Sequence, residues 1–227
     1  MEIEFIIATW FQPFYKECVQ SWYDTATTPL TEITVAKMDL VTAYQQGFEL
    51  SVQEILGFVH DDTKIYERGW DRRVLREFED PLVGLVGFGG APGFCHPNLK
   101  PENYSLGAMG RIGFRSNMRN AEVHGSRMTG AENATILDGF AMFVRREVLE
   151  KAGGWPVDSP VSYWMYDAWL ACITRELGYK IRIVGVDCDH LGGRSTGMNP
   201  NLKMNAEEAH EYVYRRFQKI LPAMVEP

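Results

Sequence analysis

The sequence lacks the features that mark several common classes of protein. No uninterrupted apolar run approaches the roughly 20 residues that span a bilayer. The opening segment, MEIEFIIATW, carries acids where a secretory signal carries bases. There is also no internal repeat and no low-complexity tract. We therefore expect a folded cytoplasmic protein without a transmembrane segment.

Paired cysteines and an excess of basic charge are also missing. The four cysteines, Cys18, Cys95, Cys172 and Cys188, form no CxxC pair, which argues against a zinc ribbon or a disulfide framework and indicates buried thiols. The net charge is −7, so the surface as a whole has no attraction for polyanions. A nucleic-acid partner is therefore disfavoured.

What is present is an ordinary globular composition with an alternation of strand and helix patterns. The chain has 227 residues, of which 45% are hydrophobic and 23% charged, enough for one large domain. Strands are predicted over 2–9, 32–36, 54–59, 81–88 and 180–186. Helices are predicted over 41–50, 66–78, 147–152 and 205–221, with one more helix that begins at residue 14 and another that ends at residue 177. This alternation predicts an α/β fold with a mostly parallel sheet.

Residues 89–133 interrupt the alternation. The segment is rich in Gly, Pro, Asn, Arg and Met and has little periodicity, and an irregular excursion of this length in a compact domain is usually functional or mobile. It also holds four arginines, which we interpret first as a solvated face, with recognition of an anionic acceptor or of a diphosphate as alternatives: Arg111, Arg115, Arg119 and Arg127.

Two adjacent carboxylates follow the third predicted strand, in the run His60-Asp61-Asp62. Ligands of open α/β sheets bind outside the carboxyl ends of the strands, and hard oxygen ligands there suit Mg²⁺ or Mn²⁺ bridging the phosphates of a nucleotide. Alternatively, Asp61 caps the next helix and Asp62 is solvated. The pair alone favours neither interpretation.

A series of short motifs in a fixed order gives the strongest indication. It comprises Ala43-Tyr44, Val59-His60-Asp61-Asp62, Asp138-Gly139-Phe140, Gly153-Gly154-Trp155, Tyr166-Asp167, Gly178-Tyr179-Lys180 and His190 followed by Gly192-Gly193. This series resembles family 2 glycosyltransferases of the GT-A fold over nearly the whole chain. The resemblance implies a single domain built as a three-layer, Rossmann-like sandwich, residues 1–90 forming the nucleotide-binding half. Residues 91–227 would form the donor-sugar and acceptor half, with a C-terminal helix.

The resemblance also implies roles for individual residues. Asp62 and His190 are the expected metal ligands, with Asp61 on the ribose and His60 in a supporting role. For His190 the alternatives are a surface or capping histidine, with two rival ligands on the same segment, Asp187 and Asp189.

Asp167 is the expected general base. It stands in Tyr166-Asp167, where family members often carry Glu-Asp, and its apolar neighbours argue against the alternative of a surface carboxylate. The remaining expected nucleotide, sugar and diphosphate contacts are Thr9, Trp10, Asp39, Tyr44, Asp138, Gly139, Arg194 and Ser195. Among these, Asp138 is expected on sugar hydroxyls with Gly139 leaving room for the sugar, or as a turn pair instead.

The predicted function is metal-dependent transfer of a hexose, with inversion, from a UDP-sugar to an acceptor hydroxyl on a glycan or other molecule. Mn²⁺ or Mg²⁺ is the expected cofactor, and UDP-glucose or UDP-galactose the favoured donor. One alternative is a sugar nucleotidyltransferase, although residues 9–13 lack the glycines and base of its phosphate loop. The other is a nucleotide-sugar or glycan-binding module that has lost catalysis.

Overall fold

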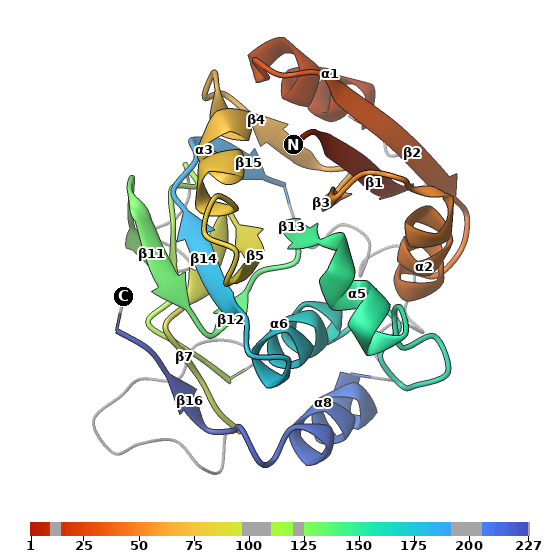
Figure 1. The fold of residues 1–227 in the computed structure, drawn as a ribbon, viewed down its shortest axis with the longest axis vertical. Coiled ribbons are helices and arrows are strands. Elements are labelled where there is room, and N and C mark those ends of the chain that lie inside the picture. Colours follow the sequence, from red (N-terminus) through yellow and green to blue (C-terminus); the bar gives the residue numbers. More distant parts are fainter. Residues whose placement is uncertain (10–14, 97–109, 120–124, 192–205, 227) are drawn as a thin grey trace.

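A seven-stranded sheet with the order β11-β14-β5-β13-β3-β1-β2 forms the centre of the protein (Figure 1). The structure is a computed structural model that describes residues 1–9, 15–96, 110–119, 125–191 and 206–226. The strands of the sheet are β1 (Ile3–Thr9), β2 (Leu30–Ala36), β3 (Ile55–His60), β5 (Val83–Gly87), β11 (Ala131–Ala134), β13 (Ala141–Arg145) and β14 (Lys180–Val184). β2, β1, β3, β5 and β14 run parallel, and β13 and β11 run against them. The predicted mostly parallel sheet is confirmed.

Helices cover both faces of this sheet. They are α1 (Tyr15–Thr25), α2 (Leu40–Leu50), α3 (Trp70–Glu77), α5 (Arg146–Ala152), α6 (Tyr166–Glu176) and α8 (Ala206–Arg216). One hydrophobic cluster joins the sheet to α2, α5, α6 and α8, and a second joins its other face to α1 and α3. The three predicted layers are therefore present. Among the described residues, no helix has the length and apolar character needed to cross a membrane.

The apolar run of β1 is buried on both faces because its side chains alternate between the two clusters. Phe5 packs against Trp22 of α1, with ring centroids 5.1 Å apart, and Trp22 in turn meets Trp70 of α3 at 5.0 Å. Ile6 points to the other side, toward the cluster that includes Val41 of α2. Packing on both faces holds β1 in the sheet and so fixes the position of its carboxyl end.

The excursion over residues 89–133 contains more structure than its sequence indicates. Short strands in and near it build two small sheets, ordered β10-β9-β6-β12 and β16-β7-β8. These strands are β6 (Gly89–Ala91), β7 (Gly93–Phe94), β8 (Arg111–Ile112), β9 (Arg115–Ser116), β10 (Ser126–Arg127), β12 (Ile136–Leu137) and β16 (Ala223–Met224). Strands of two or three residues are too short to show a two-residue period, so the sequence pattern missed them.

The largest differences from the predicted boundaries concern two helices. The helix expected over 66–78 begins only at Trp70, because β4 (Thr63–Ile65) comes first and Gly69 turns the chain with φ +81°. The C-terminal helix ends at Arg216, before the expected residue 221. β4 pairs with β15 (Cys188–His190), and this two-stranded sheet carries the late histidine back to the end of β3.

Candidate active site

The carboxyl ends of β1 and β3 lie side by side and carry the first pair of predicted residues. The parallel register sets Ala8 opposite His60, so the residues that follow on each strand also meet. Thr9 Oγ1 donates a hydrogen bond of 2.6 Å to Asp61 Oδ2, and both side chains are buried. The structure therefore ties Asp61 to β1, and the N-cap of the next helix, α3, is Gly69 instead.

Three possible metal ligands converge beside this pair. The pairing of β4 with β15 sets His190 opposite Thr63, and the Leu191 amide donates to the Asp62 carbonyl at 3.1 Å. His190 Nε2 lies 3.4 Å from Asp62 Oδ1, and His60 Nδ1 lies 3.2 Å from that nitrogen and 3.8 Å from the same oxygen. The structure thus brings the two predicted ligands together and adds His60 to them.

The donor set fits a divalent cation. Within the described part of the chain no hydrogen bond reaches Asp62 Oδ1, although this oxygen is buried. Bonds of about 2.1 Å to one ion place neighbouring ligand atoms about 3.0–3.5 Å apart, close to the separations observed. Two imidazoles and one carboxylate suit Mn²⁺, Fe²⁺ or Zn²⁺ and leave further positions open. An orphaned carboxylate oxygen facing two ring nitrogens is the arrangement that a cation satisfies.

The charges of the three groups depend on one another. Burial, reinforced by His190, lowers the pKa of His60 to about 4, which keeps this imidazole neutral as a metal ligand must be. Although burial opposes both changes, Asp62 raises the pKa of His190, and the two histidines lower the pKa of Asp62. Asp62 is therefore an ionised buried group, and not the solvated carboxylate of the alternative interpretation.

The rival ligands on the same segment face elsewhere. Asp187 accepts from Arg119 Nε at 3.2 Å, and Asp189 accepts from the Tyr66 hydroxyl at 2.8 Å. The ring of His190 stacks on Phe140, with centroids 5.0 Å apart. Of the three polar side chains at this strand end, only the histidine thus points to the end of β3.

A buried arginine joins the predicted base to the predicted sugar-binding carboxylate. Arg111 Nη1 donates to Asp138 Oδ2 and Nη2 donates to Asp167 Oδ2, each over 2.7 Å. Arg111 is 8% exposed and Asp167 is 4% exposed. The expectation of a solvated Arg111 is therefore wrong, because two carboxylates from distant segments draw it inside. The alternative of a surface position for Asp167 is wrong as well.

The pKa values of the two carboxylates that Arg111 contacts, those of Asp138 and Asp167, are shifted in opposite directions. Burial raises the pKa of Asp167, Arg111 opposes the rise, and the neighbouring Asp138 adds to it. Although burial also acts on Asp138, Arg111 and the two nearby histidines lower its pKa. Such a separation is typical of paired acids with different roles, and it makes Asp167 the better proton acceptor.

The other arginines of the excursion lie nearer the surface. Arg115 pairs with Glu132 at 2.8 Å, Arg119 stacks over the Tyr66 ring, and Arg127 is exposed. The prediction of a solvated face thus suits these three positions better than Arg111. Nothing in the sequence distinguished that one arginine, because its partners lie 27 and 56 residues away.

Tyr166 connects the two clusters. Its hydroxyl lies 2.5 Å from His60 Nε2, and a Cβ added at Gly139 would lie 1.9 Å from the same oxygen. The space beside Gly139, expected to admit a sugar, is therefore filled by Tyr166 in this structure. The residue before it, Met165, is buried with φ +63°, a strained conformation for a side chain of this kind.

The remaining predicted contacts are less central. Asp39 is the N-cap of α2, where its side chain accepts a hydrogen bond from the Thr42 amide at 3.0 Å. Tyr44 is fully buried against Phe58, with ring centroids 4.9 Å apart. Three further residues lie outside the described residues: Trp10, Arg194 and Ser195.

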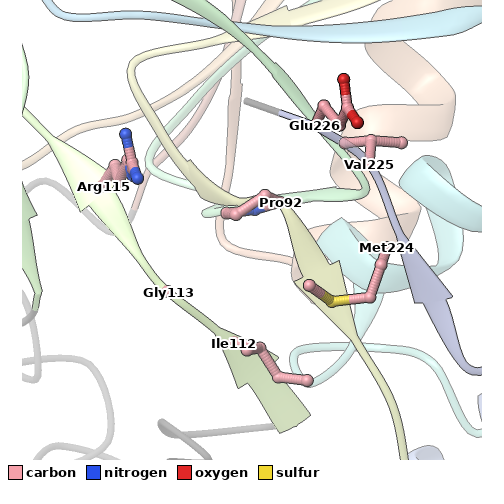
Figure 2. Close-up of a pocket in the computed structure, with 7 residues that line it drawn as sticks. All are labelled: Pro92, Ile112, Gly113, Arg115, Met224, Val225 and Glu226. Atoms are coloured by element: carbon pink, nitrogen blue, oxygen red, sulfur yellow. The ribbon is translucent and has the colours of Figure 1, made fainter. Parts of the chain in front are cut away.

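A cavity of about 470 Å³ opens elsewhere, between the small three-stranded sheet and the C-terminal segment. Figure 2 shows its lining, which consists of Pro92, Ile112, Gly113, Arg115, Met224, Val225 and Glu226. None of the predicted site residues lines it. The cavity therefore adds nothing to the chemistry at the ends of β1 and β3.

Comparisons with known proteins agree with this architecture. A family model described as "Glycosyltransferase like family" matches residues 4–209. The mannosyltransferase PcManGT from Pyrobaculum calidifontis, solved with GDP-Man and Mn²⁺, has a TM-score of 0.57 at 16% identity, over 100% of this chain and 66% of its own. GalNAc-T7, solved with UDP, GalNAc and Mn²⁺, also has a TM-score of 0.57, at 11% identity, over 83% of this chain and 43% of its own.

These likenesses confirm the predicted GT-A fold. The chain spans just under two thirds of the length of the first of these relatives and less than half of the second. Comparison with curated protein sequences finds no match.

Proposed function

Because the chain belongs to the Glycosyltransferase like family, we propose that it transfers a hexose from a nucleoside diphosphate sugar to an acceptor hydroxyl, with a divalent cation and with inversion. A UDP-sugar, UDP-glucose or UDP-galactose, is the favoured donor, and a glycan or another hydroxyl-bearing molecule the acceptor. One observation carries the proposal: the cluster of His60, Asp62 and His190, which could hold a cation, and a buried carboxylate of raised pKa, Asp167, lie at the same edge of the sheet, joined through Tyr166.

The first cluster would hold the cation. Asp62, His190 and His60 supply its ligand atoms, and the ion, when bound, stabilises the charge that develops on the departing diphosphate. Asp61, held by Thr9, is adjacent to this cluster in the chain and would contact the ribose of the nucleotide. The two related structures carry GDP-Man and UDP, so a test of the donor must include both bases.

The second cluster would perform the proton transfer. As the acceptor oxygen bonds to the anomeric carbon and the carbon–oxygen bond to the diphosphate breaks, the hydroxyl proton passes to Asp167. The raised pKa of Asp167 brings its basicity closer to neutral pH than that of an ordinary carboxylate. Arg111 holds this carboxylate in place, and Asp138, on the other end of the same guanidinium, would bind sugar hydroxyls.

Calorimetric titration tests the donor half of the proposal. UDP, GDP and a panel of their sugars are titrated with and without Mn²⁺ into the wild type, D62A and a control variant, D24A, which removes an exposed carboxylate of α1. We expect metal-dependent binding of one nucleotide that D62A loses and D24A keeps. Absence of nucleotide binding under every metal condition would refute the transferase.

The D167N variant separates the enzyme from a binding module. Since asparagine keeps the shape of the side chain but accepts no proton, we expect D167N to bind the donor as the wild type does and to lose transfer by about 10²–10⁴-fold. Undiminished transfer by D167N would exclude this residue as the base. If the wild type binds the donor but neither transfers the sugar to a hydroxyl acceptor nor hydrolyses the donor, the binding module is favoured.

A further inference from the structure

We propose that Tyr166 is a positioning residue for the metal centre: its hydroxyl holds His60 with Nδ1 directed at the point shared by Asp62 and His190. The inference rests on the proposed function, since it presumes a cation at that point. It assigns Tyr166 no contact with substrate and no part in the chemistry.

The hydrogen bond is compatible with the tautomer of His60 that a cation ligand requires. A neutral imidazole carries one N–H, and only the other nitrogen offers a lone pair. His60 Nδ1 faces the carboxylate and the second histidine, whereas Nε2 lies 2.5 Å from the Tyr166 hydroxyl. A hydroxyl oxygen can accept the N–H of Nε2. When Nδ1 binds a cation the ring proton must be on Nε2, and there the Tyr166 hydroxyl oxygen accepts it and holds the ring in that tautomer and orientation.

The tyrosine itself is held rigidly enough to orient a ring. Tyr166 is 6% exposed, its ring meets that of Tyr44 edge-on with centroids 5.9 Å apart, and its hydroxyl fills the space left by the missing side chain of Gly139. It is also the first residue of α6, after a left-handed residue at Met165. The hydroxyl therefore has a fixed place against which His60 is aligned.

Packing alone does not account for the hydroxyl. A phenylalanine would fill the same apolar volume without burying a polar group, which costs free energy unless a hydrogen bond compensates. The compensating partner here is a ring nitrogen whose opposite atom belongs to the metal cluster. Partners of this type fix the tautomer and orientation of metal-binding histidines, and their loss typically lowers metal affinity about 10–100-fold.

The experiment measures Mn²⁺ affinity by calorimetry, without nucleotide, for the wild type, Y166F and Y214F. Y214F is the matched control, because its buried hydroxyl donates to the Cys95 carbonyl at 3.2 Å, outside both clusters. We expect Y166F to bind Mn²⁺ about 10–100-fold more weakly and Y214F to bind it as the wild type does. The Co²⁺ absorption spectrum should change in Y166F alone, and circular dichroism should show both variants folded.

A double-mutant cycle gives the decisive comparison. Since Tyr166 is proposed to act only through His60, H60A and H60A/Y166F should bind Mn²⁺ equally. Wild-type affinity and an unchanged Co²⁺ spectrum in Y166F would overturn the inference, and so would a further loss when Y166F is added to H60A. If the wild type binds no divalent cation, both this inference and the metal centre of the proposed function are refuted. If the wild type binds the cation and Y166F binds it equally well, only this inference is refuted.

Discussion

Replacing Arg111 with methionine should destabilise the protein strongly and in a pH-dependent way. The guanidinium is the counter-charge of the buried carboxylate of Asp167 and the partly buried carboxylate of Asp138, at 2.7 Å each. Removing one partner of a buried ion pair typically costs about 3–5 kcal/mol, because the other charge stays buried without compensation. We expect R111M to lose about that much free energy of unfolding at pH 7.5.

The pH dependence follows from the two pKa values. In the wild type, Arg111 and the neighbouring histidines, against burial, lower the pKa of Asp138, so this group stabilises the fold above its unfolded pKa of about 3.9. Burial already raises the pKa of Asp167, so ionisation of this group lowers the stability of the fold at pH values above the unfolded pKa of about 3.9. Without Arg111 both native pKa values rise, so the native state binds more protons than the unfolded state at mildly acid pH. The loss in R111M should therefore shrink as the pH falls from 7.5 to 5.

Urea unfolding of the wild type, R111M and R115M at both pH values checks this reasoning. R115M is the matched control, since Arg115 pairs with Glu132 while its side chain is 35% exposed. Exposed pairs contribute about 1 kcal/mol or less, so R115M should cost little at either pH. An R111M loss no larger than that of R115M, or one that does not change with pH, would show that Arg111 and its two carboxylates are not held together by charge.

Three further outcomes are expected. Asp71 is fully buried, its carboxylate accepts hydrogen bonds from two backbone amides, and hydrogen bonds from Thr27 and Thr28 lower its pKa against the effect of burial. D71N should therefore lose about 1–3 kcal/mol of unfolding free energy in urea. The stability of the wild type should drop as the pH falls below about 4. Mn²⁺ at about 100 times its dissociation constant should add about 2.7 kcal/mol to the unfolding free energy, an increase that a chelator and D62A each abolish in thermal melts. G139A should lower both melting temperature and Mn²⁺ affinity, since its methyl group would meet Tyr166 at 1.9 Å, whereas G130A, with open space around the new atom, should change neither; equal melting of the two glycine variants would contradict this.

The half of the site at the strand ends could be predicted from sequence because strong local patterns set it. The apolar runs of β1 and β3 end at Thr9 and at His60-Asp61-Asp62, and parallel strands place such ends at one edge of a sheet. The sequence analysis expected a supporting role for His60 and did not predict that its ring nitrogen would join the candidate metal cluster, although its spacing of two from Asp62 was a usable signal. Side chains two apart near a strand end point the same way, while Asp61 between them turns to Thr9.

Asp138 and Asp167 were predicted from the motif series, but the contacts that join them could not be, because no local pattern marks those contacts. Arg111 lies in a two-residue strand, and its burial results from carboxylates on two later segments. The space at Gly139 is likewise filled by a residue 27 positions further along. Contacts of this kind exist only once the sheet has brought the segments together, so a single sequence carries no periodic trace of them.

The start of α6 explains how the two halves act as one site. Tyr166 and Asp167 are consecutive, and neighbouring positions on a helix point about 100° apart, so one side chain reaches His60 while the next reaches Arg111. A strained left-handed residue persists only where the surroundings fix it, and Met165, which is buried with φ +63°, immediately precedes both residues. The geometry of the proposed base and that of a proposed cation ligand therefore depend on the same backbone turn, and a change that shifts α6 should disturb both together.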